Sequence, residues 1–129
     1  MKTPGGILTE QELELMKLVW DLDRPTVRDV YETLLKQRRI AYTTVMTMMN
    51  VLVDKGHLKR TRKDRAYVYR PSRPRSETVG AMVKDFVGRV FDGSAKPLLV
   101  QLVEDGSLSE KEVDELRAVI RESKKGGGS

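Results

Sequence analysis

The chain has 129 residues, 39% hydrophobic and 33% charged, with a formal net charge of +5; this fits one domain, or a small domain with an appended segment. It contains no cysteine and a single histidine, His57, which excludes disulfides, thiolate metal sites and cysteine nucleophiles. No apolar run approaches the ~20 residues of a membrane span, and residues 1–6 lack a hydrophobic signal core, so we expect a cytoplasmic protein without metal or cofactor.

The first predicted elements are two helices that each begin at a threonine. Thr9 and Glu12 have the spacing of a capping box, and apolar residues at helical spacing continue this helix to about Trp20. Thr26 caps the second helix, with Asp29 near the positive end of the helix dipole. The predicted buried faces consist of Leu13, Leu15, Met16, Leu18, Val19 and Trp20 in the first helix and Val27, Val30, Tyr31 and Leu34 in the second.

A third helix is predicted from near Ala41 to Lys55, where Gly56 supplies the left-handed residue that ends it. Its buried stripe is Val45, Met49 and Leu52. The complementary face has short uncharged side chains that can hydrogen-bond or contact a methyl group. These are Thr43, Thr44, Met46, Thr47 and Asn50.

Two alternating segments, 58–62 and 66–70, predict a β-hairpin with a charged turn at 63–65. A proline-containing linker, 71–75, follows, and there the composition changes. Within 55–75 there are nine basic residues and one acid, Asp64. Residues 1–75 contain 16 Lys and Arg against 9 Asp and Glu, a charge of +7, whereas residues 76–129 contain 8 against 10, a charge of −2.

The rest of the sequence predicts three helices: 78–91, a short one that opens at Pro97, and one that begins with a capping box at Ser109 and Glu112. The tail 124–129 is expected to be disordered. This segment has too little mass to bury its own apolar stripes, which favours self-association over folding back on the N-terminal domain. The residues expected at that interface are Val79, Met82, Val83, Phe86, Val87, Val90, Leu99, Leu102, Leu116 and Ile120.

Three helices followed by a two-stranded wing predict a mainly α fold: a winged helix-turn-helix domain at 1–73 and a helical dimerisation domain at 74–123. A helix of this kind fits the DNA major groove, where short polar and methyl-bearing side chains read base edges. We therefore expect base contacts from Thr43, Thr44, Met46, Thr47 and Asn50. Contacts to the DNA backbone are expected from Arg38, Arg39, Tyr42, Lys59, Arg60, Arg62, Lys63 and Arg65.

Two other classes of protein remain open, a protein-interaction module and an enzyme. Winged helices also serve as protein-interaction modules, and a threonine-rich helix face is often plain solvent surface. Salt dependence separates such a module from a DNA-binding protein, whose affinity falls steeply with ionic strength. An enzyme has little support, because the sequence has no phosphate-binding glycine loop and no nucleophile with an adjacent base.

The chain resembles the penicillinase-repressor family (the BlaI, MecI and CopY group) over about residues 8–121. The resemblance depends on the run from Leu13 to Trp20, on Ala41-Tyr42-Thr43-Thr44-Val45-Met46-Thr47, on Lys55-Gly56 before the hairpin, and on the run from Leu108 to Arg117. The resemblance implies a homodimeric winged-helix repressor on a palindromic operator, controlling a β-lactam-type or other stress-response operon. It places Thr43, Thr44, Met46 and Thr47 in the groove, although this chain has Val51 where family members often have arginine.

In β-lactam-responsive members of the family, induction involves cleavage by a membrane metalloprotease sensor near an Asn-Phe pair in the C-terminal helices. The corresponding segment here has Gln101-Leu102, which makes these two residues the candidate cleavage region. Copper-responsive members sense metal through clustered cysteines near the C-terminus. This chain has none, so copper sensing by that route is excluded.

Overall fold

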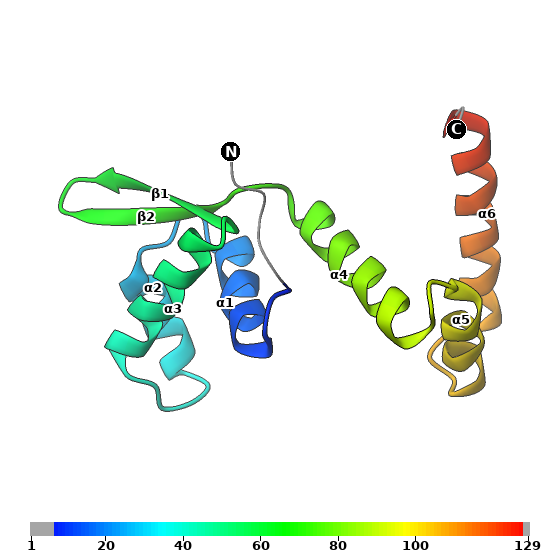
Figure 1. Cartoon of the computed structure of the whole chain (residues 1–129), viewed down its shortest axis with the longest axis horizontal. Helices are drawn as coiled ribbons and strands as arrows, with labels where there is room; N and C mark the ends of the chain where they lie inside the picture. The colour runs from blue at the N-terminus through cyan, green and yellow to red at the C-terminus, as the bar shows by residue number, and fades with distance from the viewer. Residues whose placement is uncertain (1–6, 128–129) are drawn as a thin grey trace. The chain divides into compact units, whose positions relative to one another are not determined.

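A computed structural model describes residues 7–127 as two compact units that divide between Met82 and Val83. The elements of the first unit are α1 (Glu10–Asp21), α2 (Val27–Leu35), α3 (Tyr42–Asp54), β1 (Leu58–Lys63) and β2 (Ala66–Pro71) (Figure 1). Helix α4 (Arg75–Val90) crosses the division, and α5 (Ala95–Glu104) and α6 (Glu110–Gly127) belong to the second unit. The predicted mainly α fold with a two-stranded antiparallel hairpin is confirmed.

Reciprocal side-chain caps begin three of the helices, as the sequence predicts. The Thr9 hydroxyl accepts from the Glu12 amide at 3.1 Å, and the Glu12 carboxylate accepts from the Thr9 amide at 3.0 Å. Thr26 with Asp29 and Ser109 with Glu112 repeat this arrangement. Each box satisfies amides that have no partner inside the helix, which fixes where these helices begin.

The core of the first unit lies between α1, α2 and α3 and is closed by the base of the hairpin. Val30, Leu34, Val45, Met49 and Leu52 have no exposed surface. Leu58 of β1 and Tyr69 of β2 complete this cluster, and the Tyr69 amide donates to the Pro25 carbonyl at 2.9 Å. The helical stripes predicted from the sequence therefore face one another, and Leu13, Leu18, Trp20 and Tyr31 of those stripes are half-buried at the rim.

The hairpin is longer than predicted and its turn is tighter. Strand β1 extends to Lys63 and pairs it with Ala66, so that only Asp64 and Arg65 form the turn. Asp64 has a φ of 56°, in the left-handed region that aspartate tolerates better than most residues. The base of the hairpin is buried and its outer part is exposed.

Helix α4 begins at Arg75, before the predicted start at Thr78, and its first turns belong to the first unit. Thr78 is buried, Met82 packs against the core, and the Arg75 guanidinium lies 5.1 Å from the centre of the Trp20 ring. These contacts explain why the compact units divide inside α4 and not in the linker at 71–75.

The second unit differs from the prediction at two helix ends. Helix α5 begins at Ala95 and includes Pro97 in its first turn, where the missing proline amide costs no hydrogen bond. Helix α6 continues to Gly127, although a disordered tail was predicted from residue 124. No strong helix breaker precedes Gly126, so the capped helix propagates. Residues 1–6 and 128–129 lie outside the described part of the chain. No helix between residues 7 and 127 is both long and apolar enough to cross a bilayer.

Candidate nucleic-acid interface

Helix α3 presents one face to the core and the opposite face to solvent. Val45, Met49 and Leu52 are fully buried. Thr43, Thr44, Met46 and Thr47 are exposed, as the sequence predicts for a reading face. Threonine and valine are only moderate helix formers, so packing of the buried stripe is what holds this exposed face in helical form.

The start of α3 is capped differently from the starts of α1 and α2. Its N-cap residue is Ala41, which makes no side-chain hydrogen bond, and its first turn contains no acidic residue. The first amides of a helix and its positive dipole end attract anions. An alanine cap leaves this end of the helix accessible to a phosphate. Ala41 is visible in the sequence, but the predictions from the sequence do not include an anion contact at this helix end.

The hairpin ladder separates the basic side chains of the wing into two faces. Arg60 pairs with Tyr69 and Arg62 with Tyr67, so these four residues project from the same face as the buried base. Lys59 and Lys63 project from the opposite face. The exposed basic residues of the wing are Lys59, Arg60, Arg62, Lys63 and Arg65.

A side-chain hydrogen bond joins the wing to α3. The Nη1 atom of Arg60 donates to Oδ1 of Asn50 at 2.8 Å, and Asn50 is half-buried. The Arg60 guanidinium also lies 4.7 Å from the centre of the Tyr67 ring, and that of Arg62 lies 5.8 Å from it. The structure thus joins a predicted base-reading residue to a predicted backbone-contacting residue.

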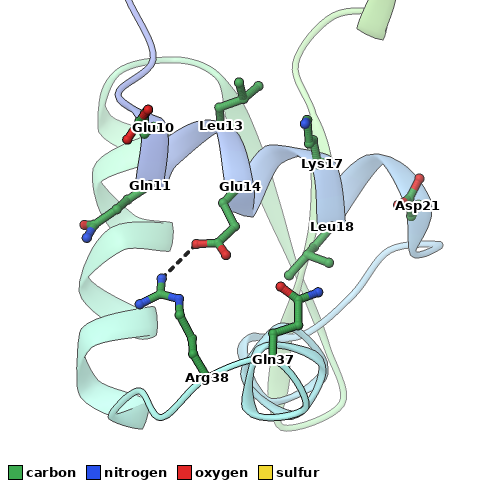
Figure 2. A pocket seen from close by; sticks show the side chains of 9 residues that line it. All are labelled: Glu10, Gln11, Leu13, Glu14, Lys17, Leu18, Asp21, Gln37 and Arg38. Atoms are coloured by element: carbon green, nitrogen blue, oxygen red, sulfur yellow. Dashed lines mark hydrogen bonds and ion pairs between the residues drawn. The ribbon is translucent and has the colours of Figure 1, made fainter.

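The two arginines before α3, Arg38 and Arg39, have different surroundings, although the sequence predicts the same role for both. Arg38 and Arg39 are both exposed, and Arg38 donates to the Glu14 carboxylate of α1 at 2.7 Å. Figure 2 shows Arg38 pointing toward Glu14 across an open pocket of about 650 Å³ between α1 and the segment after α2. Tyr42 is 37% exposed and contacts the ring of Tyr31 edge-on, with 5.3 Å between the ring centres.

An ion pair that sequence reasoning missed connects the end of α3 to the start of α1. Lys55 Nζ lies 2.8 Å from Oε2 of Glu12, whose side chain is 9% exposed. Burial raises the pKa of Glu12, but hydrogen bonds from Lys55 and from the Thr9 backbone outweigh it and lower the pKa below the usual 4.5. The sequence analysis groups Lys55 with the basic residues of the wing, whereas in the structure Lys55 forms an ion pair with Glu12 within the folded domain.

Most of the residues predicted for self-association are exposed apolar side chains. Val79, Val83, Phe86, Val90, Leu99, Leu116 and Ile120 are exposed, and Val87 and Leu102 are half-buried. Met82 differs, because it packs against the core of its own chain. The interface residues predicted from the sequence do not include three further exposed apolar residues of the same helices, namely Val100, Val103 and Val119.

The candidate cleavage region lies inside a helix. Gln101 is exposed and Leu102 is half-buried, both within α5. The Leu102 carbonyl accepts from the Ser107 amide at 2.9 Å. A protease that cleaves the chain in the region of Gln101 and Leu102 must first unwind α5. Across the described residues, no group of three or more His, Asp or Glu side chains is placed to hold a metal ion.

Comparison with known proteins places this chain beside DNA-binding regulators. The family model described as penicillinase repressor matches residues 8–122. The transcriptional regulator BlaI of Mycobacterium tuberculosis is 36% identical over 124 residues, which is 95% of this chain and 88% of that protein.

Two solved structures support the same placement. The solution structure of the DNA-binding domain of the repressor BlaI is 31% identical with a TM-score of 0.52. The monomeric form of Bacillus licheniformis BlaI in complex with the blaP half-operator is 31% identical with a TM-score of 0.50. Each comparison covers 60% of this chain and 93% of the other.

Proposed function

The chain belongs to the penicillinase-repressor family and is a DNA-binding transcriptional repressor, and we propose that it acts as a homodimer on a palindromic operator. The observation that carries the proposal is the exposed, uncharged face of α3 beside an exposed basic hairpin. In this proposal residues up to Arg73 bind DNA, and residues 74–123 hold two copies together.

Base reading is assigned to the α3 face. The hydroxyls of Thr43, Thr44 and Thr47 can hydrogen-bond base edges in the major groove, and Met46 and the threonine methyl groups fit the thymine methyl. Asn50 at the end of this face adds an amide. A face without charge discriminates between bases but contributes little affinity by itself.

Affinity is assigned to the basic residues around α3. In this proposal the side chains on both faces of the hairpin, Arg39 and the N-terminus of α3 contact phosphates. Such contacts set the register of a helix in the groove. The residues proposed for this role are Arg38, Arg39, Tyr42, Lys59, Arg60, Arg62, Lys63 and Arg65. Binding DNA requires Arg38 to leave Glu14 or to share its guanidinium with a phosphate, since the pair is 2.7 Å apart in the free protein.

The homodimer is supported by the apolar surface of α4, α5 and α6. Helix α5 has no buried residue, and nine large apolar residues of this unit, from Val83 to Ile120, are 41–61% exposed. Soluble proteins rarely leave such surface in water unless it meets a partner. A symmetric second copy would cover it and present two α3 helices to two half-sites of a palindrome.

For release from DNA, the route that the family resemblance implies is cleavage in the region of Gln101 and Leu102, which stand in place of the family's Asn-Phe pair, by a membrane-bound metalloprotease under control of a β-lactam-type or other stress signal. Within a single chain α5 has no buried residue, so in a dissociated monomer it would unwind locally at low cost, which supports this route. Mass spectrometry of fragments from cells exposed to the inducer tests it, and a chain that stays intact during induction would contradict it.

The test of the proposed function is selection of bound sequences from a random DNA pool, which is expected to return a palindrome. On that palindrome Thr47→Ala should reduce discrimination between operator variants and barely change non-specific binding. Arg62→Ala should weaken binding to every sequence and reduce the slope of log affinity against log salt by about 1. Binding that is equal for all sequences, or insensitive to salt between ~50 and ~200 mM, would favour a protein-interaction module instead.

A further inference from the structure

The junction between the wing and α3 has a polar arrangement that a simple division into base-reading and phosphate-binding residues does not explain. Arg60 lies on the hairpin face that continues the buried base, its Nη1 donates to Asn50 Oδ1 at 2.8 Å, and its guanidinium lies 4.7 Å from the centre of the Tyr67 ring. Arg60 is thus held from two sides before any DNA is bound.

This hydrogen bond changes what Asn50 offers to a base. An asparagine amide has one acceptor oxygen and one donor nitrogen, and the usual asparagine–adenine contact uses both. With Oδ1 directed to Arg60, the amide presents mainly its NH₂ group. The guanidinium beside it has no acceptor and presents further N–H donors. Together the two side chains form a surface on which donors predominate, because Arg60 already uses one lone pair of Asn50 Oδ1.

We infer that Asn50 and Arg60 act as one specificity-determining unit that reads a guanine in the major groove, with Tyr67 as the residue that positions Arg60. This inference rests on the proposed function and adds base chemistry to it. Guanine presents two acceptors, N7 and O6, to the major groove. Adenine and cytosine each present an amino donor that a surface rich in donors opposes, and thymine presents one acceptor, O4, beside a methyl group. Arg60 is therefore moved from the group of phosphate contacts to the group of base contacts.

The strand register explains how Tyr67 can position Arg60. It lies directly across from Arg62 and on the same face as Arg60, so its ring face is available to both guanidinium groups. A cation above an aromatic ring is attracted by the ring quadrupole. The ring therefore limits the rotamers that Arg60 samples, which lowers the entropy lost when Arg60 contacts a base.

The experiment measures affinity for the selected half-site and for its single-base variants, using the full-length protein, four substitutions and one control substitution. Arg60→Ala should remove a guanine preference of roughly tenfold at one base pair and shift the preference there toward adenine, because Asn50 Oδ1 becomes free. Asn50→Ala should weaken the guanine preference at the same base pair without a gain for adenine. Tyr67→Leu should weaken it in part, and Tyr67→Phe, which keeps the ring face, should retain it.

Lys59→Ala is the matched control, since it removes the same charge from the neighbouring residue on the opposite hairpin face. It should weaken all base variants alike. If Arg60→Ala also weakened all variants alike, or if the base pair that responds to both Asn50 and Arg60 preferred adenine or cytosine in the wild type, the inference would be wrong. A wild-type protein with no sequence preference would overturn the proposed function as well, whereas a preference that survives Arg60→Ala unchanged overturns only this inference.

Discussion

The two compact units use the same kind of residue in opposite ways. In the first unit, Val30 and Leu34 of α2 and Val45 and Leu52 of α3 have no exposed surface. In the second, residues with the same spacing remain in contact with water: Val83 is 51% exposed and Ile120 is 54% exposed. Periodicity alone does not distinguish these cases, because both sets form a continuous stripe on a helix.

The difference comes from the elements that pack against each apolar stripe. Helices α1, α2 and α3 and the base of the hairpin enclose one another, so the hydrophobic effect is satisfied within the first unit. Helices α5 and α6, together with the end of α4, are too few to enclose a core. We therefore expect the first unit to resist unfolding by its own packing and the second to depend on a partner copy, and the predictions that follow test this contrast.

The largest expected effect is in the core of the first unit. Leu52→Ala should lower the free energy of unfolding by about 3 kcal/mol, because it removes a fully buried side chain and leaves a cavity. Met46→Ala on the exposed face of the same helix is the matched control, and it should change stability by less than about 0.5 kcal/mol. Urea unfolding followed by circular dichroism measures both. Equal losses for the two variants would mean that α3 is not divided into a buried and a reading face.

Sequence predicted this unit well because its determinants are local. Capping boxes at Thr9 and Thr26 link residues three apart, and the buried stripes repeat every three or four residues, so both can be read without knowing the fold. The hairpin strands were found for the same reason, since alternation is also local. The turn was placed one residue too long because the left-handed conformation of Asp64 is set by the ladder on both sides of it.

Contacts between distant residues could not be predicted in this way. Glu12 and Lys55 lie 43 residues apart in the sequence, and nothing local pairs them. The hydrogen bond between Asn50 and Arg60 depends on how the wing crosses α3, and the pairing of Arg38 with Glu14 depends on how α2 ends beside α1. The start of α4 was missed because Arg75 and Met82 are held by Trp20 and the core, which are distant contacts as well.

The second prediction concerns the apolar surface of the second unit. Ile120→Asp should raise the dissociation constant of the homodimer by about 30-fold, equivalent to about 2 kcal/mol, because an unpaired carboxylate would be placed in an apolar interface. Ser123→Asp adds the same charge to an exposed polar position of α6 and should leave the dimer intact. Sedimentation equilibrium over a range of concentrations measures both constants. A wild-type chain that is monomeric at micromolar concentration, or an Ile120→Asp variant that dimerises normally, would contradict the contrast between the two units.

The smallest expected effect concerns the ion pair between Glu12 of α1 and Lys55 at the end of α3. Glu12→Gln keeps an oxygen that can accept from the Thr9 amide, so it preserves the capping box but removes the ion pair with Lys55. We expect a loss of about 1 kcal/mol in the free energy of unfolding at neutral pH, a modest value because the Lys55 side chain is 33% exposed. Glu14→Gln, which breaks the more exposed pair with Arg38, is the control and should cost less.

The pH dependence identifies the cause of that loss. Because the pKa of Glu12 is lower in the folded protein than its usual 4.5, its stabilising contribution is fully present above pH 4.5. It is lost as the pH falls through the lower folded pKa, since the carboxylate then becomes protonated in both states. The gap in unfolding free energy between wild type and Glu12→Gln should therefore close in acid. A gap that stays constant from neutral pH to about pH 3 would attribute the loss to altered helix capping and not to the charge of Glu12.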